Sequence, residues 1–236
     1  MFYRDIIKAN DLNCYKIHQK ESNIFVCTKG KFKSKAKLYL DEARNQIETY
    51  IKTYPHFGVS FKPIKVDTAA PSLIRSMQGA SISTNTGPMA SVAGAVSFYV
   101  GQRLLKFSDE VIVENGGDIF LKSLKERIVL IYAGKSPLNK RIALKVPISS
   151  KPYGICTSSG TLGHSFSFGK ADAVVIISHD SILSDAWATR IANMIKKESD
   201  IKRGINLLKK QSKILGGLII KGRKLAIAGK IPIKSI

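Results

Sequence analysis

Three short segments of this sequence join glycines to side chains that bear oxygen, and a fourth places such side chains at the predicted start of a helix. These segments span residues 84–90, 114–119, 157–165 and 184–189. Glycine lets a backbone approach a ligand closely, and Ser and Thr hydroxyls contact phosphate groups or a hard cation. Any one segment is more typical of an ordinary turn. Together they favour a site that contacts phosphate groups or a hard cation.

Asp185 and Thr189, in the fourth segment, are four residues apart. On a helix this spacing places both side chains on one face, where a carboxylate and a hydroxyl can reach the same ion. Mg²⁺ prefers such hard oxygen ligands. The alternative is that Asp185 favours the helix dipole and Thr189 bonds to the preceding turn. Spacing alone favours this alternative.

A second helix is predicted beside the first segment, capped by Asn85 or Thr86, with Pro88 in its first turn, and running to Val100. Free N–H groups at a buried helix N-terminus bind phosphate or carboxylate. In the third segment, His164 could act as an acid or base near neutral pH or donate a hydrogen bond to a phosphate group. It could equally be a polar surface residue.

The order and approximate spacing of three of these motifs resemble the ApbE superfamily, the FAD:protein FMN transferases. The motifs are Asn-Gly-Gly-Asp-Ile at 115–119, Thr-Ser-Ser-Gly at 157–160 and Asp-Ala-Trp-Ala-Thr at 185–189. Residues 87–95, Gly-Pro-Met-Ala-Ser-Val-Ala-Gly-Ala, add a closer resemblance to the short, uncharacterised ApbE-like proteins of bacteria and archaea. The resemblance implies a flavin nucleotide, FAD or FMN, and Mg²⁺ as cofactors.

The resemblance also implies roles for individual residues. Asp185 and Thr189 would be metal ligands, joined by a backbone carbonyl near Met89, and His164 and Asp185 would be catalytic. The residues expected at the nucleotide site are Thr86, Gly87, Asn115, Gly116, Gly117, Asp118, Thr157, Ser158, Ser159 and Gly160.

The sequence departs from the transferases in two places. Their Asp-Pro-x-Thr-Gly motif is replaced by Ser-Phe-Ser-Phe-Gly at 165–169, and the Lys-Gly of their central segment is Ala90-Ser91. The function that we expect is a Mg²⁺-dependent transferase or hydrolase acting on a flavin or nucleotide-like phosphorylated metabolite. The alternatives are a non-catalytic small-molecule-binding protein of the same fold and a nucleic-acid-associated protein that uses the basic C-terminal region.

Strands are expected to outnumber helices, mostly at hairpin spacing, which is typical of an α+β protein with a largely antiparallel sheet. The resemblance adds an ApbE-like fold, with mixed or antiparallel sheets packed with helices around a glycine-lined central cleft. We expect one domain over 1–236, and two interleaved lobes stay open. A loop-rich section is expected at 57–86. The expected strands are 14–28 as a hairpin at a sheet edge, 111–114, 118–122, 127–133, 142–146, 153–156, 173–178, 218–220, 225–228 and 231–233, and the remaining helices are 34–54, 181–197 and 200–212.

The chain is strongly basic: Lys and Arg total 38 against 17 Asp and Glu, giving a formal net charge of +21 over 236 residues. Residues 196–236 hold twelve Lys or Arg and two acidic residues, hence 12 − 2 = +10. No aromatic residue follows Trp187 to stack a base, and no zinc-finger spacing occurs. A solvated lysine face is therefore favoured over nucleic-acid binding.

Cys14, Cys27 and Cys156 are odd in number and lack Cys-x-x-Cys spacing, which argues against disulfides and a structural zinc site and predicts reduced thiols. The first ten residues contain no apolar signal-peptide core. The most apolar stretch, 90–100, is about half as long as a membrane span. We therefore expect a cytoplasmic protein that does not enter a membrane, and a homo-oligomer stays open.

Overall fold

The computed structural model describes residues 9–160, 169–230 and 232–236. Its main sheet has eight strands in the order β1-β2-β3-β4-β7-β8-β9-β10, and a second sheet has three, in the order β11-β6-β5. Every pairing within the described residues is antiparallel. The α+β prediction with largely antiparallel sheets is confirmed.

The described residues form the following strands and helices, in chain order. The strands are β1 Asn13–Gln19, β2 Ser22–Thr28, β3 Val111–Asn115, β4 Asp118–Lys122, β5 Arg127–Leu130, β6 Ile142–Val146, β7 Tyr153–Ser158, β8 Ala173–Ser178, β9 Ile214–Lys221, β10 Lys224–Gly229 and β11 Ile233–Ser235. The helices are α1 Lys33–Thr53, α2 Pro55–Val59, α3 Ser72–Thr84, α4 Val92–Leu104, α5 Ser181–Met194 and α6 Ile201–Lys209, with 3₁₀ turns η2 Pro88–Ser91 and η3 Glu198–Asp200.

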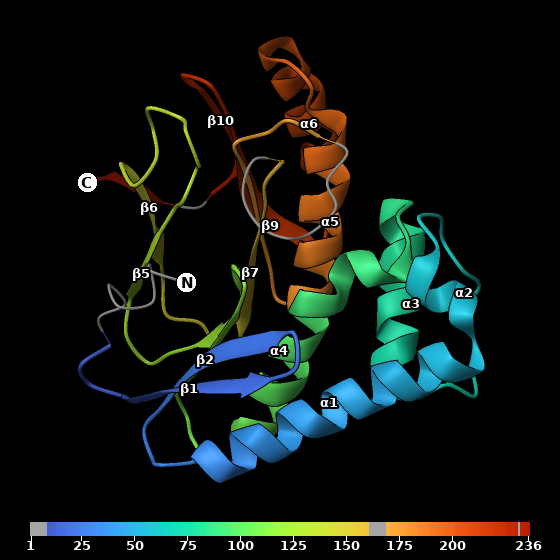
Figure 1. Cartoon of the computed structure of the whole chain (residues 1–236). Helices are drawn as coiled ribbons and strands as arrows, with labels where there is room; N and C mark the ends of the chain where they lie inside the picture. Colours follow the sequence, from blue (N-terminus) through green and yellow to red (C-terminus); the bar gives the residue numbers. More distant parts are fainter. Residues whose placement is uncertain (1–8, 161–168, 231) are drawn as a thin grey trace.

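The central strands of the main sheet are buried on both faces. Along β8, Val174 and Ile176 pack with α5 and α6, whereas Val175 and Ile177 pack with residues of the second sheet. This alternation follows from the two-residue period of a strand. Figure 1 shows the same layers, with α5 and α6 on one side of β7 and β9 and with β5 and β6 on the other. The helix layer positions the candidate site.

The loop-rich section predicted for 57–86 is wrong, because α3 lies within it. Leu73, Ile74 and Met77 are buried at helical spacing, and the helix ends at Asn85, whose backbone is left-handed with φ of 52°. The serines of α3 and Gly79, which lie near these apolar residues in the sequence, hid the pattern. Asn85 therefore closes α3 and caps no following helix. The predicted helix at Pro88 begins as η2 and becomes α-helical only at Val92.

The prediction of three reduced thiols is also wrong for two of them. Cys14 and Cys27 form a disulfide, and Cys156 is a buried free thiol. Cys14 and Cys27 are direct partners in the β1–β2 register, with Cα atoms 4.1 Å apart. A hairpin brings such cross-strand side chains together whatever their spacing in the sequence. The predicted placement of this hairpin at a sheet edge is confirmed, since β1 is the first strand of the main sheet.

Candidate functional site

Asp185 and Thr189 lie on one face of α5, and both meet the segment that starts α4. The helix begins at Ser181 because the Asp180 side chain accepts hydrogen bonds from the backbone N–H groups of Ile182 and Leu183. Asp185 Oδ2 accepts a hydrogen bond from the Gly94 N–H at 2.8 Å. Thr189 Oγ1 donates to the carbonyl oxygen of Ala90 at 3.3 Å. The carboxylate, the hydroxyl and a backbone carbonyl are thus neighbours.

Gly94 makes this arrangement possible. A Cβ atom at this position would lie 2.2 Å from the Ser181 carbonyl oxygen and 2.7 Å from Asp185 Cβ. The Gly94 carbonyl in turn accepts hydrogen bonds from the hydroxyls of Ser97 and Ser181, at 3.0 and 2.9 Å. The two helices therefore touch through backbone and small side chains, which holds Asp185 against the start of α4.

Asp118 is a second buried carboxylate close to Asp185. Burial, followed by the negative charges of Asp185 and Glu114, raises the pKa of Asp118 well above its usual value. The carboxylate interacts with the Cys156 thiol and the Thr157 backbone. Its Oδ1 atom is buried and has no hydrogen-bond partner among the described residues.

The pKa values of the groups around Asp118 are shifted in the same direction. Burial raises the pKa of Asp185 to about 7, although the N–H groups of Gly94 and Ala93 favour its charged form. Burial also raises the pKa of the Cys156 thiol, with the charges of Asp118 and Asp185 adding to the effect. Two carboxylates in one buried site cannot both be ionised unless a cation compensates their charge, and otherwise at least one of them binds a proton.

The glycine pair forms the turn between β3 and β4. Gly116 and Gly117 have φ values of 67° and 107°, which favour glycine, and Asn115 pairs with Asp118 across the turn. Asn115 Nδ2 donates to the carbonyl oxygen of Ala93 at 3.2 Å. This bond ties the turn to the same segment, 90–94, that contacts α5.

The third predicted segment lies at the end of β7. Thr157 and Ser158 are the last residues of that strand and are half-buried, as is Ser159. Gly160 donates its N–H to the Ala171 carbonyl at 2.9 Å, and a Cβ atom here would lie 2.2 Å from the carbonyl oxygen of Gly169. His164 lies outside the described residues.

Thr86 and Gly87 have evident packing roles. Thr86 is buried, and its hydroxyl pairs with that of Thr84 at 2.8 Å. A Cβ atom at Gly87 would lie 1.7 Å from the carbonyl oxygen of Ser60, so only glycine fits there. Both residues help to hold η2, and with it the Ala90 carbonyl, beside α5.

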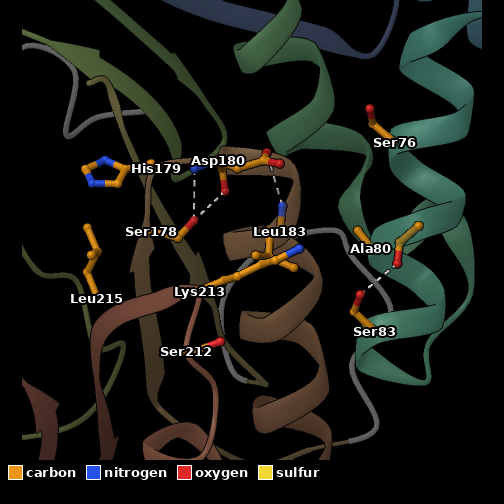
Figure 2. A pocket seen from close by; sticks show the side chains of 11 residues that line it. Ser76, Ala80, Ser83, Ser178, His179, Asp180, Leu183, Ser212, Lys213 and Leu215 are labelled. Atoms are coloured by element: carbon orange, nitrogen blue, oxygen red, sulfur yellow. Dashed lines mark hydrogen bonds between the residues drawn. The ribbon is translucent and has the colours of Figure 1, made fainter. Parts of the chain in front are cut away.

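The expected glycine-lined cleft is not confirmed. A hollow of about 520 Å³ lies elsewhere, between α3, the start of α5 and the start of β9 (Figure 2), and none of the predicted site residues that the structure describes lines it. Within the described ranges, no three His, Cys, Asp or Glu side chains are grouped closely enough to hold a metal ion. A cation beside Asp185 would therefore need hydroxyl or carbonyl ligands as well.

Three groups that surround or position Asp185 were not identified from the sequence. These are Cys156, the backbone N–H groups of Ala93 and Gly94, and Asp180, which caps the N-terminus of α5. Two of them gave a signal in the sequence: Gly94, as a glycine within a helix of small residues, predicts close packing, and Asp180, just before the predicted helix, is a preferred N-cap residue.

The fold is that of the ApbE flavin transferases. The flavin transferase ApbE from Vibrio cholerae matches with a TM-score of 0.65 and 12% identity, covering 92% of this chain and 97% of that one. The apo flavinyl transferase ApbE of Pseudomonas stutzeri matches with a TM-score of 0.59 and 14% identity, covering 92% and 93%. At such low identity the likeness shows the fold alone.

The sequence comparisons define the family. The family model described as AbpE bacteria matches residues 4–219. A UPF0280 protein of Methanocaldococcus jannaschii is 40% identical over 220 residues, covering 90% of this chain and 89% of that protein. Another, from Methanococcus aeolicus, is 43% identical over 166 residues, covering 69% and 67%. The chain belongs to this ApbE-like family, and the resemblance found in its motifs is confirmed.

The helices can be compared with the length and hydropathy that a membrane span needs. Among the residues that the structure describes, no helix combines the length and the apolar character that crossing a bilayer requires.

Proposed function

We propose that this chain is a Mg²⁺-dependent transferase or hydrolase that acts on the phosphoanhydride of a flavin or nucleotide-like metabolite. The observation that carries the proposal is the pair of buried carboxylates, Asp118 and Asp185. Neither forms an ion pair with a Lys, Arg or His among the described residues, although the chain has 38 Lys and Arg. A bound cation would neutralise them.

The donor atoms fit Mg²⁺. Asp185, Thr189 and the Ala90 carbonyl offer three different oxygens, and the unpartnered Oδ1 of Asp118 lies near by in the same buried cluster. Mg²⁺ is bound through few protein oxygens and keeps water or substrate phosphates in its other positions. Bound here, it would polarise a phosphoryl oxygen and spread its developing charge.

The chain's own residues would bind and orient the substrate. The N–H groups of Ala93 and Gly94 hold Asp185 in place. Thr157 and Ser158, at the end of β7, would donate hydroxyl hydrogen bonds to the phosphates or to the acceptor. His164 belongs to the proposal as an acid or base that moves a proton at the attacking or leaving oxygen.

The proposal is tested by thermal unfolding of the purified protein with FAD, FMN or ATP, each with and without Mg²⁺. A ligand that binds only the folded state stabilises it by about 2.7 kcal/mol at a hundred times its dissociation constant. We expect a Mg²⁺-dependent shift in the wild type, its loss in Asp185→Asn, and its retention in Asp200→Asn. Asp200 is the control because, among the described residues, its carboxylate accepts hydrogen bonds from the backbone N–H groups of Lys196 and Lys197 and from no side chain.

Turnover is measured separately, by chromatography of the products released from each nucleotide. Mg²⁺-dependent release of AMP from FAD would support transfer or hydrolysis. Binding without turnover would leave a non-catalytic protein of the same fold. If no nucleotide shifts unfolding, with or without Mg²⁺, the flavin or nucleotide assignment is refuted.

A further inference from the structure

The hollow of about 520 Å³ is a groove apart from the site described above. One wall is the α3 face that carries Ser76, Gly79 and Ser83. The opposite walls come from the start of α5, with Asp180 and Leu183, and from the residues before β9, with Lys213. Figure 2 shows the Lys213 side chain extending from that segment toward α3. The volume lies within the range of small-molecule sites.

Gly79 lines the groove, and the neighbouring atoms would leave room for a side chain there. An added Cβ atom at Gly79 would have no atom within 4 Å. At Gly94, Gly101 and Gly204, the corresponding atom would approach a neighbour to 2.7 Å or less, so close packing explains those helical glycines. Packing does not explain Gly79, which weakens a helix relative to alanine. Close approach of a ligand to the helix backbone does explain it.

The polar groups of the groove suit a sugar phosphate. Lys213 makes no hydrogen bond or ion pair with any residue in the described part of the chain. Asp180 uses Oδ1 for both backbone N–H groups of its helix cap, which leaves Oδ2 to accept a sugar hydroxyl. Ser83 donates its proton to the Gly79 carbonyl and can accept from a ligand. The cation would bind the phosphate, and the oxygens would bind the sugar.

Lys213 is the cation of the groove lining, and Asp180 is its carboxylate. Burial raises the pKa of Asp180, and the charge of Lys213 opposes this effect. Asp180 is tied to its helix cap through Oδ1 and forms no ion pair with Lys213 within the described residues. The ammonium group of Lys213 can therefore meet an anionic group of a ligand.

The groove and the carboxylate site lie on different faces of α5. Leu183, which lines the groove, is two residues from Asp185, and a helix rotates by about 200° over two residues. Asp185 faces Gly94 of α4, whereas the groove lies between α5 and α3. A ligand in the groove would leave Asp185 free.

We infer that this groove is a second binding site, for a phosphorylated sugar, whose phosphate binds Lys213 and whose hydroxyls bind Asp180 and the serines of α3. The ligand is either a free sugar phosphate or the ribose phosphate of a nucleotide. Both share the chemistry that the groove offers. The inference does not depend on the reaction proposed for the carboxylate site.

The test is titration calorimetry with ribose 5-phosphate and with AMP as the two probes, in the absence of Mg²⁺. We expect at least one probe to bind the wild type with a dissociation constant of about 1 mM or tighter. Gly79→Leu fills the groove from a position with open space, and Lys213→Gln removes the cation. Each should weaken binding about tenfold or more, Gly79→Leu because its side chain occupies the space of the ligand and Lys213→Gln because it removes a hydrogen bond to a charged group.

Two control variants distinguish binding in the groove from binding elsewhere on the chain. Lys209→Gln removes an exposed cation that does not line the groove, and Asp185→Asn disables the carboxylate site. Both should bind the probe as the wild type does, whereas Gly79→Ala should weaken binding less than Gly79→Leu because its side chain is smaller. Binding of ribose 5-phosphate identifies a free sugar phosphate, and binding of AMP alone identifies a nucleotide.

Two results would overturn the inference. One is that neither probe binds the wild type. The other is that binding is lost in Asp185→Asn or Lys209→Gln but kept in Gly79→Leu, since the probe would then occupy the carboxylate site or the general basic surface.

Discussion

Gly94→Ala should destabilise the protein and displace Asp185. The added Cβ atom would lie 2.2 Å from the Ser181 carbonyl oxygen and 2.7 Å from Asp185 Cβ. Both contacts are with backbone or with the first side-chain atom, so rotation of a side chain cannot relieve them. The two helices α4 and α5 must move apart, and the hydrogen bond from the Gly94 N–H to Asp185 Oδ2 lengthens.

The expected change in the free energy of unfolding is the sum of two destabilising contributions and one stabilising contribution. Overpacking of a well-packed interior costs about 1–3 kcal/mol. Loss of a hydrogen bond to a charged group adds about 1.5–3 kcal/mol. Alanine recovers about 1 kcal/mol of helix propensity relative to glycine. The net expectation is a loss of about 3 kcal/mol in the free energy of unfolding.

Urea-induced unfolding, followed by circular dichroism, measures this loss. Gly79→Ala is the matched control, because the same substitution in α3 meets no atom within 4 Å and should stabilise the protein by about 0.5–1 kcal/mol. The reasoning is refuted if Gly94→Ala unfolds at the same urea concentration as the wild type or at a higher one. Equal effects of the two substitutions would show that helix propensity, and not the α4–α5 contact, decides the outcome.

Three further predictions concern other parts of the molecule. Arg127→Met should cost about 2 kcal/mol in urea unfolding, because it removes the 3.0 Å ion pair of the buried Glu110 carboxylate and leaves it only the longer one with Lys29, at 3.7 Å; a loss equal to that of a surface substitution would contradict this. Reduction of Cys14–Cys27, which are 13 residues apart, should lower stability by about 2–3 kcal/mol, and a Cys14→Ser variant should then be insensitive to reductant. Burial raises the pKa of Asp180, so the folded state binds this proton more tightly than the unfolded chain, and the free energy of unfolding should fall as pH rises from about 4 toward that raised pKa. In Asp180→Asn, which keeps a helix cap, the urea midpoint should fall less over the same pH range. An identical decline in both proteins would disprove the assignment.

Local patterns made most of the fold predictable. The hairpin around 20–23, the long helix α1 and the β3–β4 turn each depend on residues close in sequence, and each lies where its pattern indicates. The helix α3 was missed because its polar residues resemble a loop, while the buried face that makes it a helix depends on partners elsewhere. The cysteine pair was missed for a similar reason, since strand register and not local spacing decides it.

The candidate site was less predictable because its contacts join distant parts of the chain. The four-residue spacing of Asp185 and Thr189 indicates a shared helix face, but not what that face meets. The bond between Gly94 and Asp185 spans 91 residues of sequence. The neighbourhood of Asp118, Cys156 and Asp185 depends on the pairing of β4 with β7 and on α5 packing against both. Those relations follow only from the assembled sheet and helix layers.

Charge distribution gives the strongest physical reason to expect a cation at the carboxylate site. Buried charges in proteins are normally paired, because desolvation of a lone ion costs far more than a fold can supply. Here the chain places most of its 38 basic side chains on its surface, and none of those in the described residues pairs with Asp118 or Asp185. Without a cation, the raised pKa values of both groups favour protonation. In our proposal the positive charge arrives with the ligand, and the unpartnered Oδ1 of Asp118 is available to it.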